Sequence, residues 1–342
     1  MTTASDAPFL VAAAQLAPVF LDQTATVDKA CVAIAEAGAR GARLVVFPEA
    51  FVPSYPFWVW FVPAGETRLL RSLYADLLAE AVTVPGPATD KLCAAARAAG
   101  TYVAVGINER DPDGSGTSLY NTIVYIDADG RLLGTHRKLV PTAGERLVHG
   151  RGDGSTLEVF PTKLGRLSGL VCWENYMPLA RYALYAWGVQ LYVAPTWDRG
   201  EPWLSTLRHI AKEGRVYVIG CCSAVRRADV PDRYDLVQRF LPRDQEWINP
   251  GDSAIVNPDG KFIAGPVREC EEILYAEVDP RDLVGPRWQL DVAGHYGRPD
   301  VFRLTVDRAH RPMVEVSSPA AAIGRYEPPG AALLPATPPG SD

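Results

Sequence analysis

Short apolar runs alternate with amphipathic segments over most of the chain. The apolar runs predict strands at residues 9–16, 43–47, 102–107, 190–194 and 216–220. The amphipathic segments predict helices at residues 26–39, 90–99, 180–187 and 203–213. Two further segments, 121–134 and 253–265, each place an Asp-Gly pair between β-rich runs, which is the pattern of a hairpin. Hairpins interleaved with strand–helix units predict the α/β class, with mixed sheets covered by helices rather than one purely parallel sheet.

The pattern stops near residue 312, and this predicts the domain organisation. Residues 313–342 are rich in Ala, Pro and Gly, a composition with too little apolar surface to fold alone. We therefore expect one domain over residues 1–312 and a peripheral or disordered tail over 313–342.

Composition narrows the class of protein. With 342 residues, 48% of them hydrophobic and 22% charged, the chain can bury a large core. Its net charge of −6 argues against a nucleic-acid partner. No apolar run is long enough for a membrane span, and the first residues lack the basic segment of a secretion signal, so we expect a cytoplasmic protein. Six scattered cysteines without metal-ligand spacing predict free thiols and no metal.

Cys172 is the first candidate for chemistry. A strand-like run leads into Cys172-Trp-Glu-Asn, and a helix is predicted to open near Pro178. A thiol at a strand-to-helix junction lies near free N–H groups and a helix dipole, and we expect both to favour the thiolate. On Cys172 alone, a buried structural cysteine is the better interpretation.

Three other ionisable residues follow predicted strands. Glu49 lies just beyond the run 43–47, while Lys138 and Glu145 lie in the loop after the first hairpin. Each taken singly is also compatible with a surface charge. Together with Cys172 they make chemical sense, because a thiolate can attack an electrophilic carbon while a carboxylate moves protons and an ammonium stabilises negative charge.

Three motifs resemble the active-site signatures of the nitrilase superfamily. They are Phe-Pro-Glu-Ala at 47–50, His-Arg-Lys-Leu-Val-Pro-Thr at 136–142 and Val-Cys-Trp-Glu-Asn at 171–175. The resemblance extends over roughly residues 8–305. It implies that Glu49 is the general base, Lys138 the charge stabiliser and Cys172 the nucleophile, and that Glu145 positions substrate and protons. It also implies an α-β-β-α sandwich that works without a cofactor and assembles through helices into dimers or helical filaments.

Further segments are similar to true nitrilases rather than to the amidase or carbamoylase branches. They are Pro-Thr-x-x-Glu-Arg at 141–146, Phe-Val-Pro-Ser-Tyr-Pro-Phe-Trp at 51–58 and the segment 291–302. The resemblance implies hydrolysis of a small nitrile to a carboxylic acid and ammonia through a thioimidate and a thioester. The alternatives are an amidase that uses the same residues, or a scaffold without activity, which the intact Glu49, Lys138, Glu145 and Cys172 speak against.

Aromatic residues near these positions bear on the substrate. We expect the substrate pocket to include Tyr55, Trp58, Trp173, Tyr176, Trp197 and His136. The backbone N–H of Trp173 is a candidate donor to a developing anion, and His136 is expected to orient its loop. Flat apolar walls favour aromatic or arylaceto nitriles, whereas an aliphatic nitrile or cyanide would be expected if most of these rings were core.

Overall fold

Two mixed β-sheets form the body of the protein in the computed structural model, which describes residues 7–112 and 114–312. The first sheet contains β1 (Phe9–Gln15), β2 (Ala42–Val46), β3 (Tyr102–Arg110), β4 (Leu119–Ile126), β5 (Leu132–Arg137) and β13 (Glu272–Val278). The second contains β6 (Phe160–Thr162), β7 (Gly165–Gly169), β8 (Leu191–Thr196), β9 (Tyr217–Cys222), β10 (Ala224–Arg226), β11 (Trp247–Val256) and β12 (Phe262–Arg268).

Each sheet has a parallel centre with antiparallel edges. The order in the first is β13-β1-β2-β3-β4-β5, in which β1, β2 and β3 are parallel. The order in the second is β10-β11-β9-β8-β7-β6, with β12 paired to β11, and here β7, β8 and β9 are parallel. The two predicted hairpins are present as β4–β5 and β11–β12.

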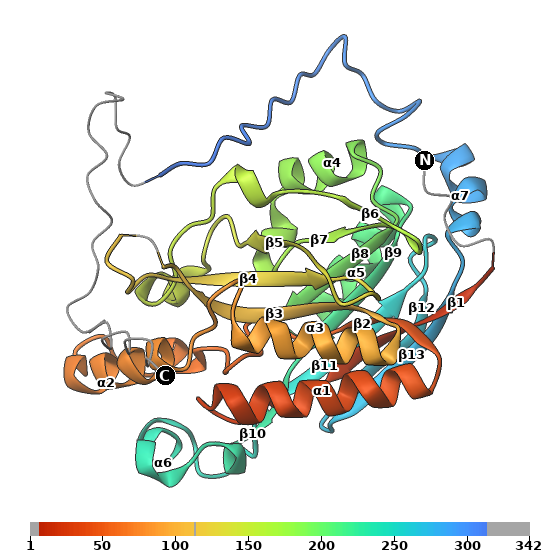
Figure 1. Cartoon of the computed structure of the whole chain (residues 1–342). Coiled ribbons are helices and arrows are strands. Elements are labelled where there is room, and N and C mark those ends of the chain that lie inside the picture. Colours follow the sequence, from red (N-terminus) through yellow and green to blue (C-terminus); the bar gives the residue numbers. More distant parts are fainter. Residues whose placement is uncertain (1–6, 113, 313–342) are drawn as a thin grey trace, which may run out of the picture. The chain divides into compact units, whose positions relative to one another are not determined.

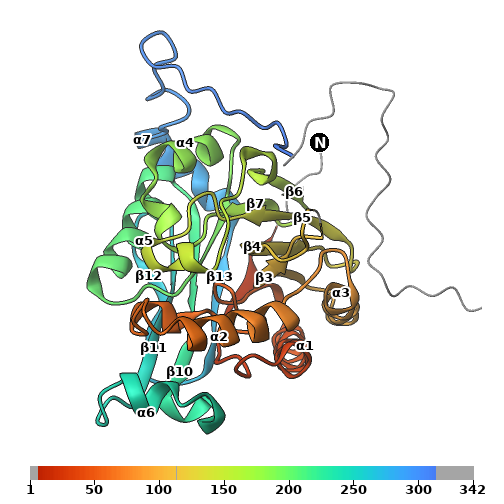
Figure 2. The ribbon, with the colours of Figure 1, turned by 90° about the vertical axis from the view of Figure 1, so that its left-hand side faces the viewer.

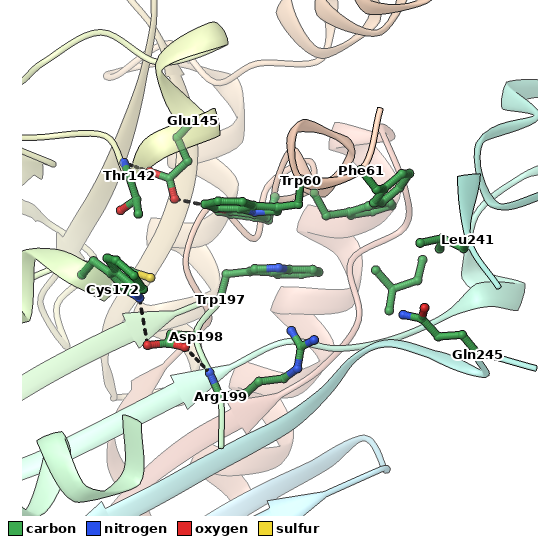
Figure 3. A pocket seen from close by; sticks show the side chains of 14 residues that line it. Trp60, Phe61, Thr142, Glu145, Cys172, Trp197, Asp198, Arg199, Leu241 and Gln245 are labelled. Atoms are coloured by element: carbon green, nitrogen blue, oxygen red, sulfur yellow. Dashed lines mark hydrogen bonds between the residues drawn. The ribbon is translucent and has the colours of Figure 1, made fainter. Parts of the chain in front are cut away.

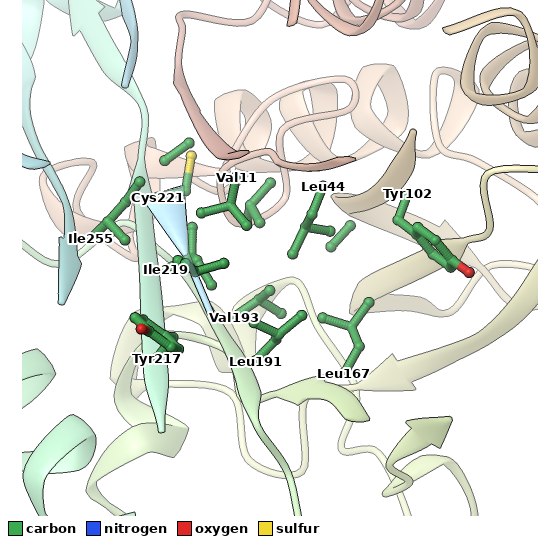
Figure 4. Close-up of a cluster of buried hydrophobic side chains, with 14 of the residues drawn as sticks. Val11, Leu44, Tyr102, Leu167, Leu191, Val193, Tyr217, Ile219, Cys221 and Ile255 are labelled. Atoms are coloured by element: carbon green, nitrogen blue, oxygen red, sulfur yellow. The ribbon is translucent and has the colours of Figure 1, made fainter. Parts of the chain in front are cut away.

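The core lies between the two sheets. Side chains from β1 and β2 meet side chains from β7, β8, β9 and β11 in one buried apolar cluster (Figure 4). Val11 and Leu44 approach from the first sheet, and Val193 and Ile219 from the second. All four are fully buried, so this layer contributes much of the hydrophobic stabilisation that holds the sheets together.

Helices cover the outer faces (Figures 1 and 2). The helices are α1 (Gln23–Ala39), α2 (Thr67–Ala79), α3 (Pro87–Ala99), α4 (Pro178–Ala186), α5 (Glu201–Gly214), α6 (Leu236–Phe240) and α7 (Val284–Gln289). Helix α1 buries Val27, Ala30, Ile34 and Ala37 against the first sheet, which is the spacing of one helical face. Helices α4 and α5 bury their apolar faces against the second sheet. The layers are therefore α-β-β-α, as the resemblance to the nitrilase superfamily implies.

The predicted elements lie within a few residues of those observed. Helix α1 begins three residues before the predicted start because Asp22 caps it and accepts a hydrogen bond from the Ala25 N–H. Helix α3 begins earlier too, with Pro87 in its first turn. Helix α2 and the edge strand β13 were not predicted. Among the described residues no helix is long and apolar enough to cross a membrane. The predicted tail, 313–342, lies outside the described residues.

Candidate active site

Glu49 stands on the turn that follows β2. This turn crosses β3 at Gly106, where a Cβ atom would collide with the Pro48 carbonyl oxygen. The glycine therefore allows the turn to lie directly against the sheet. Glu49 Oε1 accepts hydrogen bonds from Asn121 Nδ2 and Lys138 Nζ, both at 2.7 Å, and Oε2 accepts one from the Trp197 backbone N–H at 2.7 Å. The carboxylate is buried and held from three elements.

Lys138 follows β5 and joins two carboxylates. Its Nζ donates to Glu49 Oε1 at 2.7 Å and to Glu145 Oε2 at 2.8 Å, and all three side chains are fully buried. Glu145 lies in a single 3-10 turn, Ala143–Leu147. It is fixed further by the Tyr55 hydroxyl, which donates to Oε1 at 2.7 Å, and by the Thr142 N–H, which donates to Oε2 at 2.8 Å.

Cys172 occupies a strained turn after β7. Its φ of 51° is in the left-handed region, uncommon for a residue with a side chain. Asn175 stabilises the turn, because its Nδ2 donates to the carbonyl oxygens of Leu170 at 2.9 Å and of Cys172 at 2.8 Å. Strain of this kind, held by surrounding hydrogen bonds, is typical of functional positions.

The prediction that Cys172 is a thiolate was wrong. The residue opens a short 3-10 turn, Cys172–Tyr176, and the α-helix starts only at Pro178, so no long helix dipole points at the sulfur. Burial raises the pKa of the Cys172 thiol well above its usual range, and the neighbouring Glu49 carboxylate raises it further, outweighing Lys138. Both effects favour the thiol form of Cys172 over the thiolate, and a base near the sulfur would be required to form the thiolate.

Glu49 has the properties of that base. Burial raises its pKa to about 7, against the opposing effect of the Lys138 ammonium. Cys172 is close enough to Glu49 for each group to affect the pKa of the other. Burial raises the pKa of Glu145, but Lys138, His149 and the Tyr55 hydroxyl together outweigh burial, so the pKa is lowered. Burial lowers the pKa of Lys138, but the surrounding acids outweigh it, so this pKa is raised. Two carboxylates in one site thus differ in basicity, which suits one to proton transfer and the other to a fixed charge.

Glu174 is a buried carboxylate beside the site, and the sequence reasoning did not predict its contacts. Its Oε1 accepts the Leu139 N–H at 2.7 Å, and its Oε2 accepts the Val171 N–H at 2.9 Å. His136 Nε2 lies 3.0 Å from Oε2, and Glu174 raises the pKa of this histidine against the effect of burial. The carboxylate therefore links Val171, the residue before Cys172, to Leu139, the residue after Lys138.

A cavity of about 290 Å³ opens beside Cys172. In Figure 3, Cys172 and Glu145 lie at one end, Leu241 and Gln245 at the other, and Trp197 and Arg199 between them. The full lining is Tyr55, Phe57, Trp60, Phe61, Thr142, Glu145, Cys172, Trp173, Trp197, Asp198, Arg199, Leu241, Gln245 and Ile248. The volume is at the lower end of the range for small-molecule sites, about 300–1,000 Å³.

Three of the six expected pocket residues line this cavity: Tyr55, Trp173 and Trp197. The other three are corrected by the structure. Trp58 is buried against Phe20 and Phe57 and does not reach the cavity.

His136 is turned inward to Glu174, and the Tyr176 hydroxyl meets Thr206 and Asp198. The local sequence did not indicate that Asp198 and Arg199 line the cavity. The same holds for Leu241, Gln245 and Ile248, because tertiary folding brings them to the cavity. Among residues 7–112 and 114–312, no group of three His, Cys, Asp or Glu side chains is arranged to hold a metal ion.

Comparison with known proteins bears directly on this geometry. A family model described as carbon-nitrogen hydrolase matches residues 10–285. The chain belongs to the carbon-nitrogen hydrolase family. An aliphatic nitrilase of Sinorhizobium fredii is 44% identical over 301 residues, which are 87% of this chain and 96% of that protein. A bifunctional nitrilase/nitrile hydratase of Lupinus angustifolius is 40% identical over 300 residues, 85% of this chain and 84% of that protein.

The carbon-nitrogen hydrolase fold is also found among solved structures. Saccharomyces cerevisiae Nit3, a member of the nitrilase superfamily, superposes with a TM-score of 0.66 at 23% identity over 86% of this chain and 99% of that one. This likeness concerns the fold alone. The relatives named nitrilase place the chain in the nitrilase branch of the family, and the predicted chemistry, hydrolysis of nitriles, is confirmed at that level.

Proposed function

We propose that this enzyme hydrolyses an organic nitrile to a carboxylic acid and ammonia, with Cys172 as nucleophile, Glu49 as base, Lys138 as charge stabiliser and Glu145 as positioning acid. The observation that carries the proposal is the buried ammonium of Lys138, bonded to both carboxylates in a site where the Cys172 thiol lies at the end of an apolar cavity.

The first stage forms a carbon–sulfur bond. Glu49, with its pKa of about 7, accepts the thiol proton of Cys172, and the sulfur attacks the nitrile carbon. The nitrile nitrogen takes up a proton through Glu49, which gives a covalent thioimidate. Lys138 and the Trp173 backbone N–H are the donors that we assign to the developing negative charge.

The second stage uses two waters. Glu49 activates the first water, which adds to the thioimidate carbon, and the tetrahedral intermediate expels ammonia to leave a thioester. A second water then releases the carboxylic acid and returns the proton to the sulfur of Cys172. If the first tetrahedral intermediate expels sulfur instead, the product is an amide, and the relative named nitrilase/nitrile hydratase makes this branch worth measuring.

The substrates that we favour are aromatic or arylaceto nitriles. Trp197 stacks on Tyr55 with ring centroids 4.6 Å apart and on Phe57 at 5.7 Å, so the cavity wall is flat and apolar beside the thiol. Burying a ring between such surfaces contributes roughly 1.5–3 kcal/mol. An aliphatic substrate is the alternative, since one relative is named an aliphatic nitrilase.

Ammonia release from a panel of nitriles tests the proposal. The panel is phenylacetonitrile, benzonitrile, an aliphatic dinitrile, cyanide and phenylacetamide, compared by kcat/KM. Preference for an aryl or arylaceto nitrile is expected. Preference for the dinitrile or cyanide would overturn the substrate class, and turnover of the amide alone would overturn nitrile hydrolysis in favour of an amidase.

We also propose that the enzyme is a homo-oligomer, at least a dimer, working in the cytoplasm. An apolar groove along α4 supports assembly, because Leu179, Val301 and Phe302 on it are 66%, 55% and 76% exposed. Arg181 and Tyr185 on α4 bond to Glu213, and Tyr185 and Glu213 line the same groove. Light scattering measures the outcome, and a fully active monomer would refute it.

A further inference from the structure

Arg199 places a positive charge in the wall of the catalytic cavity. Its side chain is exposed and lines the cavity beside Trp197 (Figure 3). Within the described part of the chain, the structure records no hydrogen bond or ion pair from its guanidinium, whereas most other cavity residues are aromatic or aliphatic. A guanidinium without a recorded partner in a largely apolar wall is a ready donor to a ligand.

The loop that carries Arg199 is rigidly tied to the catalytic centre. The Trp197 N–H donates to Glu49 Oε2 at 2.7 Å, and Asn249 Nδ2 donates to the Trp197 carbonyl oxygen at 2.7 Å. The Gly200 N–H donates to Asp252 Oδ2 at 2.7 Å. Because these bonds flank Arg199 on both sides, its backbone is held in a fixed position relative to the proposed base Glu49.

The negative groups of the cavity already have partners. Glu145 is bonded to Lys138. Asp198 accepts the Trp173 indole N–H at 2.9 Å with Oδ2 and the Arg199 backbone N–H at 2.8 Å with Oδ1. Both acids are therefore satisfied by donors of the protein, while the Arg199 guanidinium is left for the ligand.

We propose that the cavity binds nitriles that carry a carboxylate remote from the nitrile carbon, with the carboxylate on Arg199 and the nitrile at Cys172. This rests on the proposed nitrile hydrolysis and names the class of substrate within it. A planar guanidinium matches a carboxylate through two parallel hydrogen bonds, and the rings of Tyr55 and Trp197 line the space between the two ends.

The experiment compares charged and neutral twins of one substrate. The meta and para isomers of (cyanomethyl)benzoate are each assayed against the corresponding carboxamide, which has the same shape without the charge. For at least one isomer the wild-type enzyme is expected to show kcat/KM about fivefold or more higher for the carboxylate. That ratio should fall as salt rises from about 20 to about 500 mM, because an exposed charge pair is screened.

Variants assign the effect to Arg199. Arg199→Gln is expected to bring the carboxylate-to-amide ratio to one or below, and Arg199→Lys to keep part of it. Arg43→Gln, a matched loss of one exposed arginine on β2, is the control and should keep the wild-type ratio. Since the Arg199 side chain has no recorded bond to the described protein, loss of folding is not the expected result of either change, and thermal melts check this.

The outcomes separate this inference from the proposed function. Hydrolysis of phenylacetonitrile with no preference for either carboxylate overturns the inference and leaves nitrile hydrolysis standing. If Arg199→Gln keeps the preference for the carboxylate, Arg199 is not the residue that binds it. Absence of ammonia from every nitrile overturns the proposed function itself.

Discussion

Asn121 donates a hydrogen bond to Glu49, and removing this bond should shift the pH dependence of the enzyme. Its Nδ2 donates at 2.7 Å to the Glu49 carboxylate, and both side chains are buried. A hydrogen bond to a charged group contributes about 1.5–3 kcal/mol, and one pKa unit corresponds to about 1.36 kcal/mol. Asn121→Ala should therefore raise the pKa of Glu49 by about 1–2 units.

The direction of the effect follows from the role of Glu49 as base. Activity requires its ionised form, so kcat/KM rises with pH through its pKa of about 7. With Asn121→Ala the midpoint moves up to about 8–9, and kcat/KM at pH 7 falls by about 5- to 50-fold as the ionised fraction drops. The loss should shrink steadily as the pH is raised.

The assay is kcat/KM for phenylacetonitrile across the pH range, because this substrate does not itself titrate and kcat/KM reports the free enzyme. Asn121→Leu fills the space left by the amide and excludes a replacing water, so it should shift the midpoint at least as far. Asn257→Ala, in the distant turn of the second hairpin, is the control. A folded Asn121→Ala enzyme whose rate falls equally at every pH would refute the reasoning.

Three further changes test the rest of the site. Cys172→Ala should leave a folded protein, shown by an unchanged melting curve, that releases no ammonia; residual turnover would contradict the nucleophile. Glu145→Gln should lower kcat by about 100-fold or more, since it removes one of the two charges that hold Lys138; near-normal turnover would reduce Glu145 to a loop charge. Glu174→Ala should lower the free energy of unfolding by about 3–5 kcal/mol, because it leaves His136 and two backbone N–H groups without their acceptor. Chemical denaturation measures this change, and a loss below about 1 kcal/mol would contradict the stabilising role of the Glu174 carboxylate.

The sequence predicted what depends on local pattern. Period-two and period-3.6 runs located most strands and helices, because each element must bury one face. Glu49, Lys138 and Cys172 were identifiable because each lies in a short motif at a strand end, and the structure brings Glu49 and Lys138 into contact.

Long-range contacts account for what was missed. Asn121 lies 72 residues from Glu49, and Glu174 lies 35 residues from Leu139, so no local pattern links them. The prediction that Cys172 is a thiolate was wrong for the same reason. Burial and the charge of Glu49 raise the pKa of the thiol, and both arise from tertiary structure. Trp58 looks like any other aromatic in its run, and only the fold shows that it points into the core.

The two ends of the cavity are held in place in different ways. Its inner end is bound to the sheets by hydrogen bonds to Glu49 and Lys138, whereas its outer end is supplied by Leu241, Gln245 and Ile248 from one continuous stretch of chain. Directed evolution of this enzyme toward new substrates can use this difference between the two ends of the cavity. A library that varies Leu241 and Gln245 changes the shape of this end of the cavity but leaves the proposed proton-transfer residues unchanged. Most of its members should therefore remain active, with altered substrate specificity.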